Sequence, residues 1–457
     1  MYRPNPPEKL KLLPRLAALR TNFITAWTAK YYEQPFVIDR AVATTFIVVT
    51  KPEYVKHILV DNHQNYIKSP MQNNALVPLV GHGLLTSEGE FWQRQRRIMQ
   101  PAFHYKLLQS FSDTMVGAAE EMLARWQPTA GTGEALEMSV EMARVTLDII
   151  CRTMFGAGVG AAEVQAVRDA SAIIAEDLGT PSYLDLFGLP QWLPRRQSRR
   201  VKNAVRDLRR LIEDIIARRR SEGAGTHGDL LDMLLDARDE ETGEGMSDEQ
   251  LRDEVITVFL AGHDTTANGL NWTWYLLSQH PEAEARIHDE LSSVLNGRAP
   301  TYEDLANLPY TKMVFEEALR LFPPAAAFMR EAIEADQIGE LKIPAGAQIT
   351  IAPWLSHRHR ALWDRPDEFD PERFTPENIQ SRHKFAYIPF GAGPRICMGK
   401  AFAMMEGPLI LATVAQRYRL QLVEGHLVEP MAKITLWPRY GLQMTVAPQV
   451  FMVEAAD

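Results

Sequence analysis

The sequence predicts a mainly α-helical fold with small β-sheets. Long segments have helical periodicity or composition, and they include residues 107–155, 195–220 and 251–278. Runs rich in β-branched residues are short and fall at about 35–50, 325–352 and 433–446. With 457 residues, 46% of them hydrophobic, the chain can bury a sizeable core as one large domain or as two to three ordinary ones.

The composition argues against several classes of function. A net charge of −9 gives no positive excess, which disfavours a nucleic-acid partner. Two cysteines far apart in sequence form no disulfide framework, which fits a reducing cytoplasm. Residues 1–7 lack the apolar segment of a signal peptide, and no apolar run reaches the roughly 18 residues of a membrane span. We therefore expect a soluble cytoplasmic protein.

The N-terminal part is predicted to be a small β-rich region. Residues 8–33 have helical composition, 36–38 and 44–49 read as strands, and a helix begins near Pro52. Residues 69–90 are predicted to be a loop with short helical turns, because prolines and glycines interrupt them.

The segment 91–97 is predicted to be helical. Trp92 and Arg96 are spaced i, i+4 and lie on one face, where an indole N–H beside a guanidinium suits a pair of anionic oxygens. A solvated basic face with a core tryptophan is the alternative. Within 107–155, Cys151 has apolar neighbours and is assigned to the core.

Residues 156–194 contain several glycines and prolines, and some of their large side chains suit either a substrate entrance or ordinary packing. These are Tyr183, Leu184, Leu186, Phe187 and Trp192. Residues 195–220 are rich in arginine on a helical period. We interpret them as a long solvated helix and not a nucleic-acid surface, because acidic residues are interspersed and aromatic residues are missing. Residues 221–248 read as a surface loop interrupted by 230–237.

The helix at 251–278 has an unusual middle, Ala261-Gly262-His263-Asp264-Thr265-Thr266. Glycine costs a helix about 1 kcal/mol relative to alanine, and threonine competes for backbone hydrogen bonds. A local groove would explain why these residues are tolerated; a kink with a buried polar cluster is the alternative. A further helix, 310–321, places Glu317 and Arg320 side by side at i, i+3.

The segment Phe390–Gly399 contains Cys397 just before a predicted helix that starts at Lys400. The helix N-terminus should lower the thiol pKa and favour the thiolate, the form that ligates metal. Glycines in this segment let the backbone approach a flat ligand. A buried structural cysteine is the alternative.

These motifs resemble those of the cytochrome P450 family. Phe-x-x-Gly-x-Arg-x-Cys-x-Gly at 390–399 is similar to the family's haem-binding loop, and Ala-Gly-x-Asp-Thr-Thr at 261–266 is similar to its oxygen-handling helix. Trp-x-x-x-Arg at 92–96, Glu-x-x-Arg at 317–320 and Pro-Glu-Arg-Phe at 371–374 also match. The resemblance implies one domain, residues 1–457, in the soluble bacterial form of the cytochrome P450 fold, with haem b between the long central helix and the cysteine loop.

The resemblance also implies roles for residues. Cys397 would be the axial iron ligand, and Thr265 and Asp264 would be catalytic, Thr265 bonding the bound oxygen and Asp264 relaying protons. Glu317, Arg320 and Arg373 would form a structural network behind the haem. The expected haem-binding positions are Trp92, Arg96, Ala261, Gly262, Arg330, Phe390, Gly393, Arg395, Cys397 and Gly399. His263 and His104 lie in no spacing that offers a paired ligand.

The implied activity is a monooxygenase that uses O₂ to hydroxylate or epoxidise a hydrophobic terpenoid, steroid or fatty acid. The side chains expected to contact substrate are apolar: Leu76, Val77, Ala325, Phe328 and Ile434. A peroxide-using or non-oxidative haem-thiolate enzyme, or a non-catalytic haem carrier or gas sensor, remains open as an alternative.

Electrons are expected from outside the chain, which is expected to be a monomer. It has no Gly-x-Gly-x-x-Gly fingerprint for a flavin domain, so a separate ferredoxin or flavodoxin with an NAD(P)H-dependent reductase is predicted. The positive charges expected to dock it near Cys397 are Arg94, Arg97, Arg382, Lys384 and Lys400.

Overall fold

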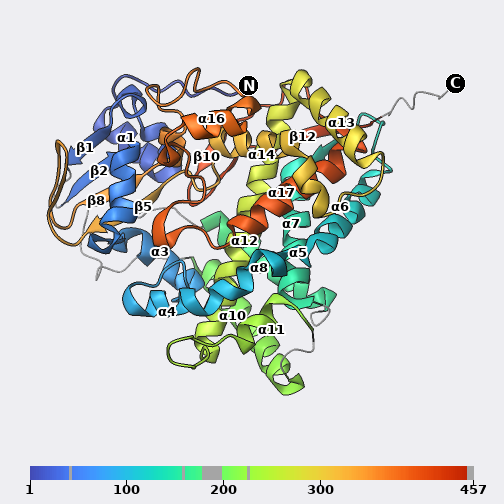
Figure 1. Cartoon of the computed structure of the whole chain (residues 1–457), viewed down its shortest axis with the longest axis horizontal. Helices are drawn as coiled ribbons and strands as arrows, with labels where there is room; N and C mark the ends of the chain where they lie inside the picture. The colour runs from blue at the N-terminus through green and yellow to red at the C-terminus, as the bar shows by residue number, and fades with distance from the viewer. Residues whose placement is uncertain (41–43, 157–159, 178–197, 224–226, 450–457) are drawn as a thin grey trace.

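The computed structural model describes residues 1–40, 44–156, 160–177, 198–223 and 227–449. Most of these residues form α-helices, with four small sheets, as the sequence predicts (Figure 1). The α-helices are α1 (Leu12–Thr21), α2 (Pro52–Lys56), α3 (Pro70–Val80), α4 (Gly89–Met99), α5 (Tyr105–Gln109), α6 (Ser112–Trp126), α7 (Met138–Phe155), α8 (Ala161–Asp177), α10 (Arg199–Glu222), α11 (Leu230–Asp236), α12 (Asp248–Ser278), α13 (Pro281–Leu295), α14 (Pro309–Leu321), α15 (Pro353–Ser356), α16 (Pro376–Ser381) and α17 (Lys400–Ala415). The strands are β1 (Phe36–Arg40), β2 (Thr45–Val49), β3 (Tyr66–Lys68), β4 (Ala135–Glu137), β5 (Phe328–Ala332), β6 (Asp336–Ile338), β7 (Leu341–Ile343), β8 (Gln348–Ile351), β9 (Tyr418–Leu422), β10 (Pro430–Ala432), β11 (Leu436–Pro438) and β12 (Gln443–Pro448).

The largest sheet joins N-terminal strands to strands that follow α14. Its order is β1-β2-β8-β5-β3, with β2 parallel to β8 (Figure 1). The inward side chains of its central strands, such as Val49 and Ile351, are fully buried. β3 pairs with β5 in the register that sets Lys68 opposite Arg330. The sheet therefore brings two cations together that are far apart in sequence.

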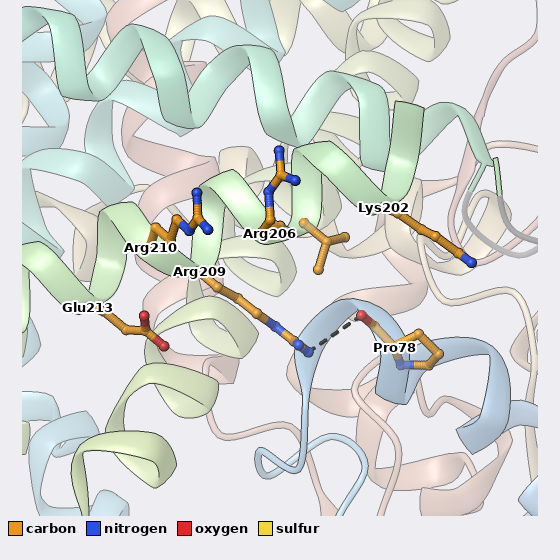
Figure 2. Close-up of a pocket in the computed structure, with 7 residues that line it drawn as sticks. Pro78, Lys202, Arg206, Arg209, Arg210 and Glu213 are labelled. Atoms are coloured by element: carbon orange, nitrogen blue, oxygen red, sulfur yellow. Dashed lines mark hydrogen bonds between the residues drawn. The ribbon is translucent and has the colours of Figure 1, made fainter. Parts of the chain in front are cut away.

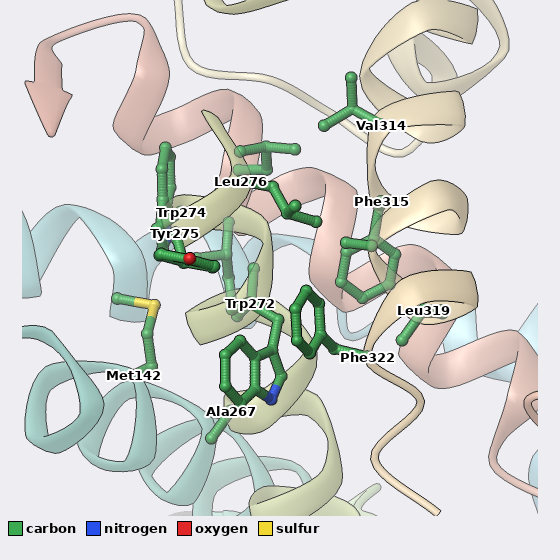
Figure 3. Close-up of a cluster of buried hydrophobic side chains, with 14 of the residues drawn as sticks. Met142, Ala267, Trp272, Trp274, Tyr275, Leu276, Val314, Phe315, Leu319 and Phe322 are labelled. Atoms are coloured by element: carbon green, nitrogen blue, oxygen red, sulfur yellow. The ribbon is translucent and has the colours of Figure 1, made fainter. Parts of the chain in front are cut away.

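The central helix α12 is fixed at both ends. Ser247 and Gln250 form a capping box at its start. Its second half is buried, where the Trp272 ring stacks on that of Phe322 with centroids 4.1 Å apart (Figure 3). The Trp272 indole N–H also donates to the Leu436 carbonyl at 3.0 Å. The middle of α12 is therefore held between two anchored segments.

A buried ion-pair network ties α14 to the chain that leads toward Cys397. Glu317 and Arg320 are both fully buried, with Nε and Oε2 2.6 Å apart. Arg320 also donates to the carbonyls of His357, Pro366 and Glu368. Arg373 Nε lies 3.6 Å from Glu317 Oε1, so the three residues predicted to form a network are in contact. Burial distinguishes this pair from an exposed i, i+3 pair, which would contribute little.

The sequence prediction was wrong over part of 69–90. Residues 70–80 form α3, because Pro70 occupies the first turn, where a missing N–H costs nothing, and Pro78 lies close to the other end. The helix stops at Gly81, whose φ of +69° is left-handed. The short strand β4 was also not predicted; it exists because β12 pairs with it. The predicted entrance residues 183–187 and Trp192 lie outside the described residues.

Searching the described residues for a helix both long and apolar enough to cross a membrane finds none. The predictions of one domain, of a monomer and of a cytoplasmic location stay predictions.

Candidate functional site

The loop around Cys397 is closed by backbone hydrogen bonds. Cys397 N–H donates to the Phe390 carbonyl at 2.9 Å, and Ile396 N–H donates to that of Gly393 at 3.1 Å. Gly393 has a φ of +70°, and a Cβ there would overlap the Leu59 carbonyl oxygen. Only glycine fits this position. The loop thus presents Cys397 as a solvent-accessible side chain immediately before α17.

The predicted lowering of the Cys397 pKa was wrong. Burial raises the pKa of this thiol, and the opposing effects of the Gly399 N–H, Arg96 and Lys400 are weaker. Although the side chain is accessible to solvent, the surrounding protein desolvates the sulfur enough to outweigh these positive groups. A bound metal ion would still favour the thiolate here, because its positive charge compensates the negative charge on the sulfur after the proton is lost.

Cationic side chains gather beside this loop. The Arg395 guanidinium lies 4.0 Å from the centre of the Trp92 ring, and Arg96 Nη1 donates to the Ile396 carbonyl at 2.9 Å. Burial and the neighbouring Arg395 lower the pKa of Arg330 to about 10. Four of the predicted haem-binding side chains (Trp92, Arg96, Arg330 and Arg395) are therefore linked to the loop that carries Cys397.

Lys68 belongs to the same cluster and was missed by the sequence analysis. Burial, followed by the repulsion of Arg395, lowers the pKa of Lys68 to about 7. The only carboxylate paired with Arg395 among the described residues is Glu88. The cluster has more positive than negative charge, so an anionic group such as the propionates of a haem suits it. Only the strand register, which sets Lys68 opposite Arg330, reveals this residue.

The segment 81–88 joins the cation cluster to α12. Lys68 Nζ donates to the carbonyls of Leu84 at 2.7 Å and Ser87 at 3.2 Å. On the other side, Glu254 of α12 accepts the Leu84 N–H at 2.8 Å. A Cβ on Gly81 would overlap the carboxylate of Asp253. Close packing of glycine on α12 therefore positions the residues that lead into α4.

The middle of α12 is part of one continuous α-helix, Asp248–Ser278. Each carbonyl from Ala261 to Asp264 accepts a side-chain hydrogen bond. The donors are Thr265 to Ala261 (2.8 Å), Thr266 to Gly262 (3.3 Å), Thr146 to His263 (3.0 Å) and Asn268 to Asp264 (2.9 Å). These bonds use the second lone pair of each carbonyl, which explains how the helix accommodates polar residues.

Three residues of this segment differ in their surroundings. Ala261 is accessible to solvent, although its helix is buried on either side. Gly262 faces α7, where a Cβ would lie 3.2 Å from Ile150 Cδ1. His263 turns back on its own helix, with Nδ1 3.0 Å from the Phe259 carbonyl. Ala261 is therefore the most accessible residue of this segment, while residues 262–265 are only partly exposed.

Glu406 is a buried acid that the sequence analysis missed. It lies on α17, 1% exposed, and its Oε2 has no hydrogen-bond partner. Burial raises its pKa to about 8, against the lowering effect of a hydrogen bond with Thr266. A lone glutamate inside the apolar run 400–415 was the available signal.

The structure brings together only some of the predicted substrate contacts. Leu76 and Ile434 pack in one hydrophobic cluster, together with Met398. Phe328 belongs to a different cluster, and the Arg330 guanidinium lies 5.2 Å from its ring centre. Val77 and Ala325 are partly buried.

Comparisons with known proteins define the class. The family model described as "Cytochrome P450" matches residues 5–446. "Cyclooctatin synthase" from Streptomyces melanosporofaciens is 37% identical over 84% of this chain and 83% of its own length. "Cyclooctat-9-en-7-ol 5-monooxygenase" from the same organism is 35% identical over 82% and 80%. The crystal structure of the cytochrome P450DA heme domain superimposes with a TM-score of 0.81 at 28% identity, covering 91% of this chain and 90% of that one.

The chain therefore belongs to the cytochrome P450 family. It is a haem-dependent monooxygenase, and its cofactor is haem b. The residues of the candidate site fit this cofactor, because an accessible thiol lies beside an excess of buried cations.

The acid Glu406 gives a pH-dependent contribution to stability. Its folded-state pKa of about 8 exceeds the ordinary glutamate value, so the folded protein retains a proton that the unfolded chain loses. We expect the free energy of unfolding to fall by roughly 1 to 3 kcal/mol between pH 6 and pH 8.5, and Glu406→Gln to reduce this fall. Denaturant unfolding at both pH values measures it.

Glu424→Gln, at an exposed position, is the control and should leave the pH dependence as in the parent protein. Equal slopes for Glu406→Gln and the parent would show that Glu406 does not hold a proton in the folded state.

Proposed function

We propose that Cys397 ligates the haem iron and that Lys68, Trp92, Arg96, Arg330 and Arg395 bind the propionates. The observation that carries this proposal is that the four cations of this set, together with Trp92, gather beside the loop that carries Cys397. When bound, the haem supplies reductive activation of O₂, and the thiolate's electron donation favours cleavage of the O–O bond. The polypeptide positions the cofactor and substrate and supplies protons.

We propose that Thr265 and Asp264 carry the proton-delivery role. The Thr265 hydroxyl donates to the Ala261 carbonyl at 2.8 Å, which leaves its oxygen lone pairs able to accept a hydrogen bond from a proton donor. Asp264 is partly exposed, so its carboxylate can exchange protons with water. A hydroxyl next to a carboxyl on one helix is a suitable pair for this transfer.

We propose a terpenoid-class substrate that is oxidised at a C–H or C=C bond. Two relatives of the chain are named for cyclooctatin and cyclooctat-9-en-7-ol, and the second is named a monooxygenase. The candidate contacts Leu76 and Ile434 are apolar and share one hydrophobic cluster, which supports a hydrocarbon-rich ligand. Steroids and fatty acids also suit the apolar contacts, but neither of these two relatives is named for such a compound. A spin-state titration of the haem with such compounds tests the substrate class.

Thr265→Ala should uncouple NAD(P)H consumption from product formation. The substitution removes the hydroxyl that we propose delivers protons, so we expect product per NAD(P)H to fall about tenfold or more. Thr265→Ser should retain most coupling. The measurement compares NAD(P)H oxidised, peroxide released and product formed.

Thr273→Ala is a matched control, because Thr273 also donates to the carbonyl one turn earlier, at 2.7 Å, but lies in the buried half of α12. Full coupling in Thr265→Ala would instead favour a peroxide-using or non-oxidative haem-thiolate enzyme.

We propose that an acidic ferredoxin or flavodoxin supplies electrons at the surface near Cys397. Lys384 and Lys400 are exposed there and support this docking surface. The other three charges predicted for it are less available to a partner. Arg94 and Arg97 are paired with buried Asp239, because the segment 239–245 folds against α4. Arg382 packs among aromatic rings, including that of Trp363 at 4.8 Å.

Lys400→Glu should slow electron transfer from a reduced acidic [2Fe–2S] ferredoxin. We expect a decrease of about tenfold at low ionic strength, shrinking in high salt, since docking is electrostatic. Stopped-flow reduction of the haem measures this rate. Lys342→Glu, an exposed change on β7, is the charge-matched control. Identical rates for both variants and the parent would remove Lys400 from the docking surface.

A further inference from the structure

A basic groove lies between α3 and α10, apart from the haem-binding residues. Its volume is about 370 Å³. Figure 2 shows its side chains, which come from one face of α10 and from the end of α3. The lining residues are Pro78, Lys202, Val205, Arg206, Arg209, Arg210 and Glu213.

The positive charges of the groove follow from helical spacing. Lys202, Arg206 and Arg210 are spaced i, i+4, i+8, and Arg209 joins them from the adjacent position. Glu213 is the only acid among the lining residues, and Arg252 of α12 neutralises it at 2.8 Å. The groove therefore retains the charge of its own cations.

Arg209 spans the groove. Its Nη2 donates to the Pro78 carbonyl at 3.4 Å, while its Nε is buried and has no hydrogen-bond partner (Figure 2). Among the described residues, the Arg206 side chain pairs with its neighbour Asp207 alone, and both side chains are more than half exposed, so this pair contributes little. In the same part of the chain, the side chains of Lys202 and Arg210 form no hydrogen bond or ion pair.

Within the described part of the chain, the arginines at the other end of α10 do have acidic partners from other segments, in contrast to the cations of the groove. Arg218 pairs with Glu163 at 3.1 Å, and Arg219 pairs with Asp232 at 2.9 Å in the protein interior. Arg220 pairs with Asp248 at 2.6 Å. Each arginine there has an acidic partner from another segment. Among the described residues, the groove cations have no acidic partner from another segment, and Glu213 of the same helix is paired with Arg252.

We propose that this groove binds a phosphoryl anion, either a small phosphate or diphosphate ester or the headgroup of a phospholipid. Guanidinium groups bind phosphoryl oxygens with two parallel N–H donors, and several such forks in one groove select a multiply charged anion over a single carboxylate. The positive charges of Lys202, Arg206, Arg209 and Arg210, which have no acidic partner from another segment among the described residues, supply this chemistry. Because the protein as a whole carries −9, the attraction is local to the groove.

The test uses the purified holoenzyme and two probes at fixed low ionic strength. Calorimetry measures binding of inorganic pyrophosphate, and vesicle flotation compares phosphatidylglycerol with phosphatidylcholine. We expect saturable binding of pyrophosphate or of the anionic vesicles, weakened about tenfold or more in the double variant Arg206→Gln/Arg209→Gln and weakened by salt.

The variant Arg199→Gln/Arg220→Gln is the matched control, because it removes the same charge from α10 outside the groove. Binding of pyrophosphate that depends on Arg206 and Arg209 assigns a soluble ester, and vesicle binding with the same dependence assigns a headgroup. Binding of neither probe, or equal weakening in both double variants, overturns the proposal. Pyrophosphate binding does not require the haem roles proposed above, so its failure leaves them intact.

Discussion

The central constraint on this structure is unbalanced charge around a desolvated sulfur. Burying cations without a paired carboxylate is costly, yet Lys68 and Arg330 are set opposite each other in a sheet and both approach Arg395. The loop beside them raises the pKa of the Cys397 thiol. A cofactor with a central cation and peripheral carboxylates relieves both costs at once. The surrounding elements can be understood as supports that hold these groups in place.

Two buried contacts hold the elements around the site in place. The Glu317–Arg320 pair is fully buried and fixes several carbonyls in the segment that leads to the cysteine loop. At the end of the same helix, α14, Phe322 stacks on Trp272 and anchors half of α12. In the polar middle of α12, side chains donate to the carbonyls of the same helix, which satisfies their own hydrogen-bonding groups. The helix therefore carries a hydroxyl and a carboxylate while remaining one continuous element.

Much of this arrangement could be predicted from the sequence because it is local. The i, i+4 spacing of Trp92 and Arg96, the glycines before Cys397 and the polar run at 261–266 are all visible in short segments. Other features depend on contacts between distant segments. Lys68 joins the site only through strand pairing with β5, and the thiol pKa depends on burial that local sequence does not reveal. From the sequence, Arg94 and Arg97 are expected to be unpaired surface charges. In the structure both pair with Asp239, which is distant in sequence.

Coordination of the iron by the Cys397 sulfur is the claim on which the residue roles depend. The most direct measurement is the absorption spectrum of the reduced, carbon-monoxide-bound protein, recorded for the parent, for Cys397→Ser and for Cys151→Ser as the cysteine control. We expect a thiolate-type Soret band in the parent and in Cys151→Ser, and its loss in Cys397→Ser. An imidazole-type band in the parent, or an unchanged spectrum in Cys397→Ser, would contradict it.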